Sequence, residues 1–383
     1  MNKILNFLPR QYDRDQLLSI KHNYLTEQFS DYKEILSKIE NVILNNDFTL
    51  GREVDNFEKS ICDLIGTKSC IAVGSGTDAI RLSLLALGIK PGDEVITTPF
   101  TFHATIGAIA TTGAKPVFVD CDEDFNISTS KIAKAITPKT KAIVPVHWAG
   151  RPVDPTSLKE ISLSNSIPII EDACHAILAH RDGVNAGAIG KTGCFSLHPL
   201  KNLNAWGDGG FICTNDMELD AKLRLMRNHG LENRDSCVLF GFNSRLDTIQ
   251  AVVANHLLMK LPKLTNKRIN NAQMLDEKLK CIDGIKIPDR TSNIHEVFHL
   301  YSFQAEKRDA LVEFLIENQI DAKKHYPVAM HLQKAARYLG YKEGDFPVAE
   351  RLAQNTISLP IHEFIVPEQI NRMSDLIWRF YHG

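Results

Sequence analysis

Lys201 is the first residue whose type and position could support chemistry. It lies in GCFSLHPLKNLNAWGDGG, residues 193–210, between the apolar run GCFSLH and the run GGFICTND that begins with two glycines. A lysine in such a loop is most often a solvated surface residue. A lysine amine can also attack a carbonyl group when its surroundings keep it unprotonated. The sequence around Lys201 leaves both interpretations open.

Glu171 and Asp172 supply two carboxylates at the end of the strongly apolar run IPIIEDACH. A carboxylate at this point could bind a metal, cap the helical pattern ACHAILA, or pair with a buried cation. An ionised carboxylate is costly to hold in a low dielectric unless a positive group meets it. A cationic ring nitrogen of a cofactor would be such a group.

GSGTDA, residues 74–79, follows a strand-like run and begins a helix-like one, so it fits the glycine fingerprint of dinucleotide-binding proteins. That fingerprint also needs an acidic residue at the end of the next strand. The next run ends in TTPF, and its acidic residues, Asp93 and Glu94, stand at its start. A nicotinamide cofactor is therefore disfavoured. An ordinary turn remains possible, but small residues at a helix start also suit a phosphate, with Ser75 and Thr77 adding hydroxyl groups.

HEVFH, residues 295–299, matches the H-E-x-x-H pattern of zinc proteases, which requires both histidines on one helix face. The surrounding VFHLYSFQ alternates and is rich in β-branched and aromatic residues, which predicts a strand. Residues four apart on a strand are separated by about 13 Å, too far to share one zinc ion. We expect no metal site here.

Seven short apolar runs between residues 69 and 216 are separated in part by helix-compatible stretches, which predicts an α/β fold. We expect a mainly parallel seven-stranded sheet between helices. Ligands of such sheets bind outside the carboxyl ends of the strands. The residues that end the runs are therefore the candidates for a site: 74–77, 100–103, His147, 172–175 and 196–201.

The chain of 383 residues is long enough for one large domain and a smaller one. A long helical pattern follows Asp247, and Pro262 is expected to kink or break it. We predict an N-terminal extension and large domain at residues 1–255. A connecting helix and a smaller α+β domain should occupy residues 256–383.

The composition excludes several classes of partner. A formal net charge of −2, with 44% hydrophobic and 23% charged residues, shows no acidic or basic bias that would mark a nucleic-acid or membrane partner. The chain shows neither a signal-peptide pattern nor a run of roughly 18 uncharged apolar residues, so we expect a cytoplasmic protein. Its eight cysteines are scattered without metal-site spacing, as in a reducing compartment.

A phosphate cradle, a strand-end carboxylate and a lysine are thus expected at one edge of one sheet. Pyridoxal 5'-phosphate (PLP) needs an anion site, an acid for its ring nitrogen and an amine for its aldehyde. These three requirements match the three features, so we interpret Lys201 as the reactive amine of a PLP enzyme.

The sequence also resembles the DegT/DnrJ/StrS sugar aminotransferases, which are PLP enzymes of fold type I in the aspartate aminotransferase superfamily. The likeness runs from about residue 47 to the C-terminal part through motifs in a fixed order: GSGTDAIRLSLLALGIKPGDEVITTPFTFHAT, PVHWAGRPVD, IIEDACHA, FSLHPLKNL, DGGFICTND, FNSRLDTIQA, HYPVAMHLQ and GDFPVAERLAQNTISLPI. The chain departs from the family pattern in Asp208, where glutamate is usual, and in its N-terminal extension.

The resemblance implies roles for individual residues. Lys201 would be the Schiff-base lysine and Asp172 the acid that faces the pyridinium nitrogen. The cofactor phosphate would be held by Gly76, Thr77 and Ser196.

Further roles implied by the resemblance are less tightly defined. Phe102 would stack on the cofactor ring, and His175 stands near the phenolic oxygen, where relatives often carry glutamine. Asn243 resembles the residue that each subunit of a homodimer lends to its neighbour's phosphate site. Weaker candidates for binding the anionic groups of the substrate are Arg245, His325 and His331.

The resemblance further implies ping-pong transamination. The amino donor is expected to be glutamate, and the acceptor a keto group of a nucleotide-linked sugar, in amino-sugar or surface-polysaccharide biosynthesis. Two alternatives remain. A PLP-dependent dehydratase of the same fold would carry histidine in place of Lys201, and a non-catalytic sensor would not need the intact pair of Lys201 and Asp172.

Overall fold

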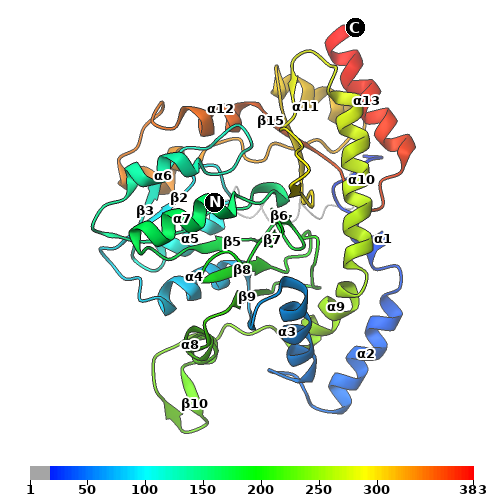
Figure 1. Ribbon diagram of the computed structural model, residues 1–383. Helices are drawn as coiled ribbons and strands as arrows, with labels where there is room; N and C mark the ends of the chain where they lie inside the picture. The colour runs from blue at the N-terminus through cyan, green and yellow to red at the C-terminus, as the bar shows by residue number, and fades with distance from the viewer. Residues whose placement is uncertain (1–17) are drawn as a thin grey trace, which may run out of the picture.

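Seven strands form the main sheet of the protein, as the sequence predicts (Figure 1). The computed structural model describes residues 18–383, and the first 17 residues, part of the predicted N-terminal extension, lie outside the described residues. In order across the sheet, the strands are β1 (Ser69–Val73), β9 (Gly210–Thr214), β8 (Thr192–Ser196), β5 (Ile170–Asp172), β4 (Thr140–Ile143), β2 (Glu94–Thr97) and β3 (Lys115–Phe118). Parallel bridges between Ile143 and Ile169 and between Val146 and Asp172 join β4 to β5. Strand β9 is antiparallel to both of its neighbours, so the sheet is mainly parallel.

Both faces of this sheet are buried because successive side chains of a strand point to opposite faces. In β9, Phe211 and Cys213 enter one hydrophobic cluster, and Ile212 between them enters the other. Strand β8 divides in the same way, with Phe195 in the first cluster and Cys194 in the second. This two-sided burial explains why the strands read as continuous apolar runs.

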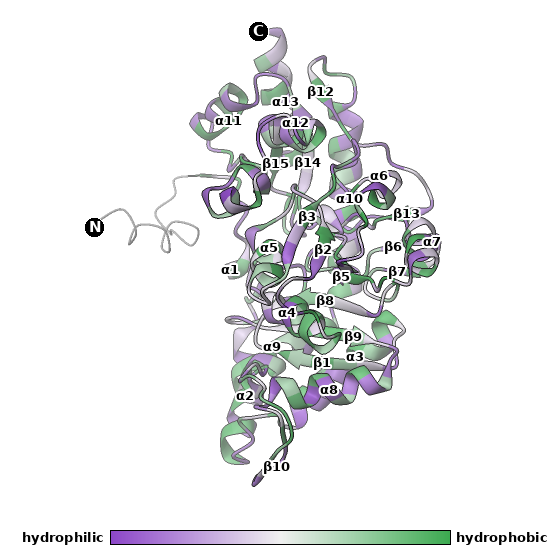
Figure 2. Ribbon diagram, turned by 90° about the vertical axis from the view of Figure 1, so that its left-hand side faces the viewer, coloured by the Kyte–Doolittle hydropathy of each residue, from purple (hydrophilic) through white to green (hydrophobic). Residues whose placement is uncertain are grey.

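Helices cover both faces. The first cluster is completed by α3 (Arg52–Ile65) and α9 (Thr248–Leu258), and the second by α4 (Gly76–Ala86), α5 (His103–Ala110) and α8 (Met217–Arg227). In Figure 2 hydrophobic residues gather where helices meet the sheet, and outward turns of helices such as α8 are hydrophilic. The remaining helices of this part are α1 (Leu25–Gln28), α2 (Tyr32–Leu44), α6 (Thr129–Ala135), α7 (Pro155–Asn165) and the 3₁₀ turn Trp148–Gly150.

The C-terminal part has its own sheet and core. Strands β12 (Ile285–Lys286), β14 (Tyr301–Ala305) and β15 (Thr356–Leu359) pair antiparallel. Around them pack α10 (Leu261–Leu279), α11 (Arg308–Glu317) and α13 (Pro367–His382), with α10 and α13 side by side in Figure 1. Helix α12 (Pro347–Asn355) and the 3₁₀ turns Met330–Leu332 and Lys334–Leu339 complete this part.

Pro262 lies in the first turn of α10, and α9 ends at Leu258, so the predicted break in the long helical pattern is confirmed. The separate hydrophobic clusters support the two-domain organisation that we propose. The proposed boundary at residues 255 and 256 falls inside α9, which packs on α3. Ile20 joins the C-terminal cluster and forms a bridge with Ile320, so a segment early in the sequence packs in the core of the C-terminal part.

Two small strand groups lie outside the main sheets. Strands β6 (His180–Arg181), β7 (Val184–Asn185) and β13 (Ile294–His295) form one group, so HEVFH begins in a strand and is not helical. Strands β10 (Leu231–Asn233) and β11 (Ser236–Cys237) form a hairpin that projects from the body of the protein (Figures 1 and 2). Between residues 18 and 383, none of the helices has the length and apolar character needed to cross a membrane.

Candidate active site

The carboxyl ends of β5 and β8 and the first turns of α4 and α5 surround one cavity of about 200 Å³. This is the sheet edge at which the sequence places its candidate residues. The predicted residues that line the cavity are Gly76, Thr77, Phe102, Asp172, His175, Ser196 and Lys201. Residues far apart in the sequence therefore meet in one site.

Asp172 ends β5 and is buried in the wall of this cavity. Its Oδ2 accepts a hydrogen bond of 2.7 Å from the hydroxyl of Thr105, and its Oδ1 accepts one of 3.2 Å from the backbone N–H of Cys174. The Thr105 hydroxyl also lies 2.8 Å from that of Thr101. These contacts fix the orientation of the carboxylate.

Glu171, the neighbour of Asp172, points away from the cavity because adjacent side chains of a strand face opposite sides. Its carboxylate is fully buried and accepts hydrogen bonds from the backbone N–H groups of Gly187, Ile189 and Gly190. The ring of His147 lies 2.9 Å from the same carboxylate. Of the two candidate carboxylates, Glu171 therefore supports the fold and Asp172 faces the site.

Lys201 lies in the loop between β8 and β9, close to Asp172. Its backbone N–H donates to the carbonyl of His198 at 2.8 Å, and its carbonyl accepts from the Asn204 side chain at 2.9 Å. Burial lowers the pKa of the Lys201 amine from its ordinary 10.5, while Cys174 and Asp172 oppose part of this effect. More of this amine is therefore neutral near pH 7 than in a solvated lysine.

The start of α4 forms another wall. Ser75 caps the helix, its side chain accepting from the backbone N–H of Asp78 at 3.0 Å. The first N–H groups of a helix have no partner within the helix, so those of Gly76 and Thr77 can serve an anion. A Cβ atom at Gly76 would lie 2.8 Å from the Cβ of Ser196 and 2.9 Å from the sulfur of Cys174. Glycine is required for this close approach.

Phe102 and His175 bound the rest of the cavity. Phe102 precedes α5 and is 48% exposed, with its ring centroid 5.6 Å from that of Tyr326. His175 is buried, and burial, followed by the charge of Lys201, holds its pKa well below 6.5. Its Nδ1 has no hydrogen-bond partner among the described residues.

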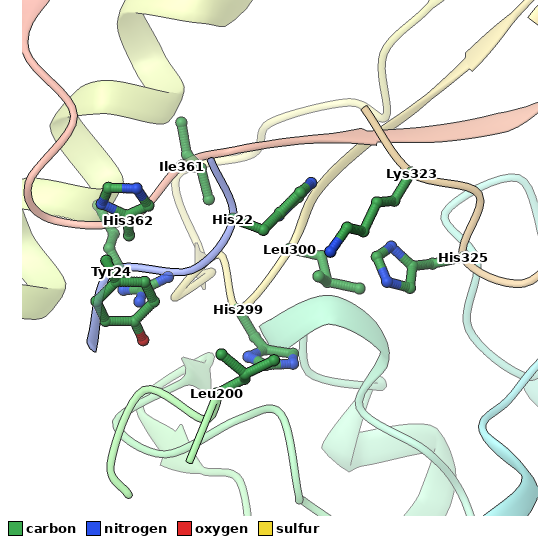
Figure 3. A pocket seen from close by; sticks show the side chains of 10 residues that line it. His22, Tyr24, Leu200, His299, Leu300, Lys323, His325, Ile361 and His362 are labelled. Carbon is green, nitrogen blue, oxygen red and sulfur yellow. The ribbon is translucent and has the colours of Figure 1, made fainter. Parts of the chain in front are cut away.

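Four predicted residues do not line this cavity. His331 is buried against Phe346, with its Nε2 3.0 Å from Glu350, and so has a packing role in this chain. His325 lines a separate, neighbouring cavity (Figure 3).

The other two predicted residues lie near the projecting hairpin. Arg245 donates to the side chain of Asn228 at 2.9 Å. Asn243 is exposed, and its backbone bridges to Asn228.

The residues of the cavity fit PLP. The cradle at Gly76 offers backbone N–H groups to a phosphate, Asp172 offers a carboxylate to a cationic ring nitrogen, and Lys201 offers an amine. The unpartnered Nδ1 of His175 can bond a polar group of a bound molecule. The structure thus brings together the three features that a PLP site requires.

Thr105 and His299 are missing from the sequence-based set of site residues. Thr105 lies inside α5, beyond the strand-end residues 100–103 that the sequence marks as candidates. The only hint of its role in the sequence is the pair of threonines four residues apart in TFHAT. The ring of His299 packs against His175 with centroids 4.3 Å apart. His299 belongs to HEVFH, but its partner in that pattern, His295, stacks instead on His180.

Comparison with known proteins gives consistent results. The model of the DegT/DnrJ/EryC1/StrS aminotransferase family matches residues 30–377. A pleiotropic regulatory protein of Geobacillus stearothermophilus is 40% identical over 363 residues, 93% of this chain and 97% of the relative. A UDP-N-acetyl-3-dehydro-α-D-glucosamine 3-aminotransferase of Acidithiobacillus ferrooxidans is 39% identical over 351 residues, 91% and 94% of the two chains.

Among solved structures, DesV of S. venezuelae in complex with a ketimine intermediate superimposes with a TM-score of 0.92. The two are 35% identical, and the match covers 95% of this chain and 99% of DesV. The likeness therefore extends over both parts of the molecule.

Proposed function

The chain belongs to the DegT/DnrJ/EryC1/StrS aminotransferase family, and we propose that it moves an amino group from glutamate to a keto group of a nucleotide-linked sugar, with PLP as its cofactor. The observation that carries this proposal is the meeting of Lys201, Asp172 and the start of α4 in one cavity. The name of the A. ferrooxidans relative, a nucleotide-sugar 3-aminotransferase, supports the class of acceptor.

PLP, when bound, supplies an aldehyde for amines and a ring that stabilises negative charge at the substrate carbon. Asp172 would hold a proton on the ring nitrogen, and Thr105 keeps its carboxylate in place. The lowered pKa of Lys201 leaves its amine able to accept a proton from the substrate carbon and return it. The backbone at Gly76 and Thr77, with Ser196, would hold the phosphate, and Phe102 would cover the ring.

A homodimer with shared sites is part of the proposal. The side chain of Asn243 has no hydrogen bond within residues 18–383, and the residue is exposed, with its backbone bridging to Asn228 just before the projecting hairpin. Phe240 in the same segment is 99% exposed, and Val238 is 53% exposed. Apolar side chains on a projecting segment favour contact with a second copy, where Asn243 would reach the neighbour's phosphate.

Two other functions compete with this one. A dehydratase of the same fold is disfavoured because Lys201 is present where that branch carries histidine. A regulatory role is suggested by the name of the G. stearothermophilus relative. The buried Asp172 and the lowered pKa of Lys201 favour catalysis over a purely regulatory protein.

The expected setting is amino-sugar or surface-polysaccharide biosynthesis in the cytoplasm. The eight free thiols support a reducing compartment. The nucleotide and the carbon that receives the amine can be found by one experiment. Enzyme carrying pyridoxamine phosphate is mixed with a panel of 3-keto and 4-keto nucleotide sugars, and the return of the PLP absorbance is followed. A response to one sugar class identifies the acceptor, whereas no response to any would contradict the proposed acceptor.

A further inference from the structure

A second cavity, of about 110 Å³, lies between the N-terminal segment, α10 and the segment that follows α11. Figure 3 shows His22 from the N-terminal segment and Lys323 and His325 from the C-terminal part pointing toward this space. The nitrogen-bearing side chains in its lining are His22, Arg268, His299, Lys323, His325 and His362.

This cavity adjoins the candidate active site. Leu200, in its wall, directly precedes Lys201, and the ring of His299 packs on His175 of the first cavity. The hydroxyl of Tyr24 lies 3.5 Å from the carbonyl of Lys201, so the N-terminal segment closes the second cavity against the Lys201 loop. The charge of Lys201 contributes to lowering the pKa of His299 and of His325, which line the second cavity, so the Lys201 amine lies near this cavity as well as in the first.

The lining has an excess of cationic groups. It includes Lys323 and Arg268, but none of its residues is acidic. Two carboxylates stand behind it: Glu363 lies 2.8 Å from Arg268, and Asp321 lies 3.4 Å from Lys323. Both carboxylates are nearly buried and pair with these cations, and the lining itself consists of nitrogen-bearing side chains, Tyr24 and apolar residues.

Two of these nitrogen atoms lack partners. Within residues 18–383, the Nδ1 of His325 is buried without a hydrogen bond, and so is the Nε2 of His22, whose ring already bonds the backbone of Ser358. Burial, followed by neighbouring cations, lowers the pKa of both rings, that of His325 to about 3. A neutral imidazole can present one N–H group, and buried polar groups of this kind are normally satisfied. An acceptor with negative charge would satisfy an N–H at Nδ1 of His325 and could contact the amine of Lys323 beside Asp321.

We propose that this cavity binds a carboxylate of the amino donor while the donor's amine meets Lys201 in the adjoining cavity. The inference rests on the proposed function and adds the place where the donor is recognised. A cavity of about 110 Å³ has room for a carboxylate group. A carboxylate on the sugar would have the same chemistry, so the two sources must be separated by experiment.

The half-reaction with donor alone tests the site. PLP-loaded enzyme is mixed with L-glutamate in the absence of sugar, and the loss of PLP absorbance is recorded by stopped flow. Lys323→Met and His325→Phe should weaken the apparent affinity for glutamate by about 10- to 100-fold, the usual effect of removing a charged hydrogen bond. The control Lys286→Met removes an exposed lysine of the same part of the chain and should leave this affinity unchanged.

Donor analogues separate recognition from a structural effect. Glutamine lacks the side-chain carboxylate of glutamate, and the α-amide of glutamate lacks the α-carboxylate. We expect the wild type to bind one of the two analogues more weakly than glutamate. Lys323→Met should hardly lower the affinity for that analogue further, because the analogue lacks the carboxylate that would pair with Lys323. Glutarate, which cannot react, should bind the wild type and bind Lys323→Met more weakly in calorimetry.

Three results would overturn the inference. Lys323→Met and His325→Phe could use glutamate as the wild type does, or their apparent affinity could fall equally for glutamate, glutamine and the α-amide. The loss could also be confined to sugars that carry a carboxylate, which would assign the cavity to the acceptor. If the wild type reacts with no amino donor at all, the proposed function fails together with the inference. If the wild type and the variants all react normally, only the inference fails.

Discussion

The hydroxyl of Thr105 donates a hydrogen bond of 2.7 Å to Oδ2 of Asp172, and this contact ties the first turn of α5 to the end of β5. Both side chains are buried. The bond stabilises the ionised carboxylate in a fixed orientation. Thr105 is thus a positioning residue for the group that we assign to the cofactor's ring nitrogen.

Replacing Thr105 by valine keeps the shape of the side chain but removes the donor. Because hydrogen bonds to charged groups contribute about 1.5–3 kcal/mol, we expect Thr105→Val to lower kcat by about 10-fold or more. Thr105→Ser keeps the hydroxyl and should restore most of the rate. Equal rates in Thr105→Val and the wild type, with intact folding, would show that the contact does not matter for turnover.

Asp172→Asn should bind PLP but turn over about 10²- to 10³-fold more slowly, since an amide cannot hold the ring nitrogen in its protonated form by charge. The PLP content measured by absorbance separates binding from turnover. Glu171→Gln is the matched control: it should lower Tm, because Glu171 accepts three backbone N–H groups, but preserve turnover per folded molecule. Near-normal turnover in Asp172→Asn would limit Asp172 to a structural role.

The lowered pKa of Lys201 predicts a pH-dependent stability of the enzyme without PLP. Between the lowered pKa and 10.5 the unfolded chain binds more protons than the folded one, so the stability of the folded state rises with pH. Lys201→Met removes the unfavourable free energy of burying a protonated amine. The variant should therefore gain stability most at neutral pH, and its advantage should shrink as the pH rises toward 10.5.

Urea unfolding at equal protein concentration and several pH values measures this difference. Lys191→Met is the control, because Lys191 is exposed and pairs with Asp216 at the surface. If the free energies of unfolding of Lys201→Met and the wild type differ by the same amount at every pH, the assignment of a desolvated amine is contradicted.

The shared-site homodimer predicts complementation. Lys201→Ala and Asn243→Asp chains should each be inactive, the second because its carboxylate would repel the neighbour's phosphate. In a mixed dimer both lesions fall in one site and the other site is intact, so co-refolding should restore up to about a quarter of the wild-type activity for a random mixture. Mixed dimers without activity, or an active monomer in sedimentation, would refute the shared site.

Much of the fold could be predicted because the main sheet is buried on both sides. Runs such as GFICT are apolar at every position, and their ends mark the sheet edge where Asp172, Ser196 and Lys201 meet. The break before α10 followed from Pro262, whose ring fits only the first turn of a helix. These features are local, so the sequence displays them directly.

Features that depend on distant packing could not be predicted. The sequence shows that Glu171 and Asp172 face opposite sides of a strand, but not which side holds the site. His22 and Lys323 are 301 positions apart in the sequence and come together only because the segment around Ile20 joins the C-terminal core. In HYPVAMHLQ, His331 is a candidate for binding an anionic group of the substrate. Its position beside Glu350 depends on how α12 packs, which the sequence does not show.

Amino transfer by this chain can be tested by the release of 2-oxoglutarate in the half-reaction with the donor alone. PLP-loaded enzyme is mixed with excess L-glutamate without sugar, and 2-oxoglutarate is quantified against the number of PLP sites. We expect one 2-oxoglutarate per site for the wild type and none for Lys201→Ala. If wild-type enzyme keeps its PLP and releases no keto acid from glutamate or any other amino donor, the chain is no aminotransferase, and a non-catalytic sensor is favoured.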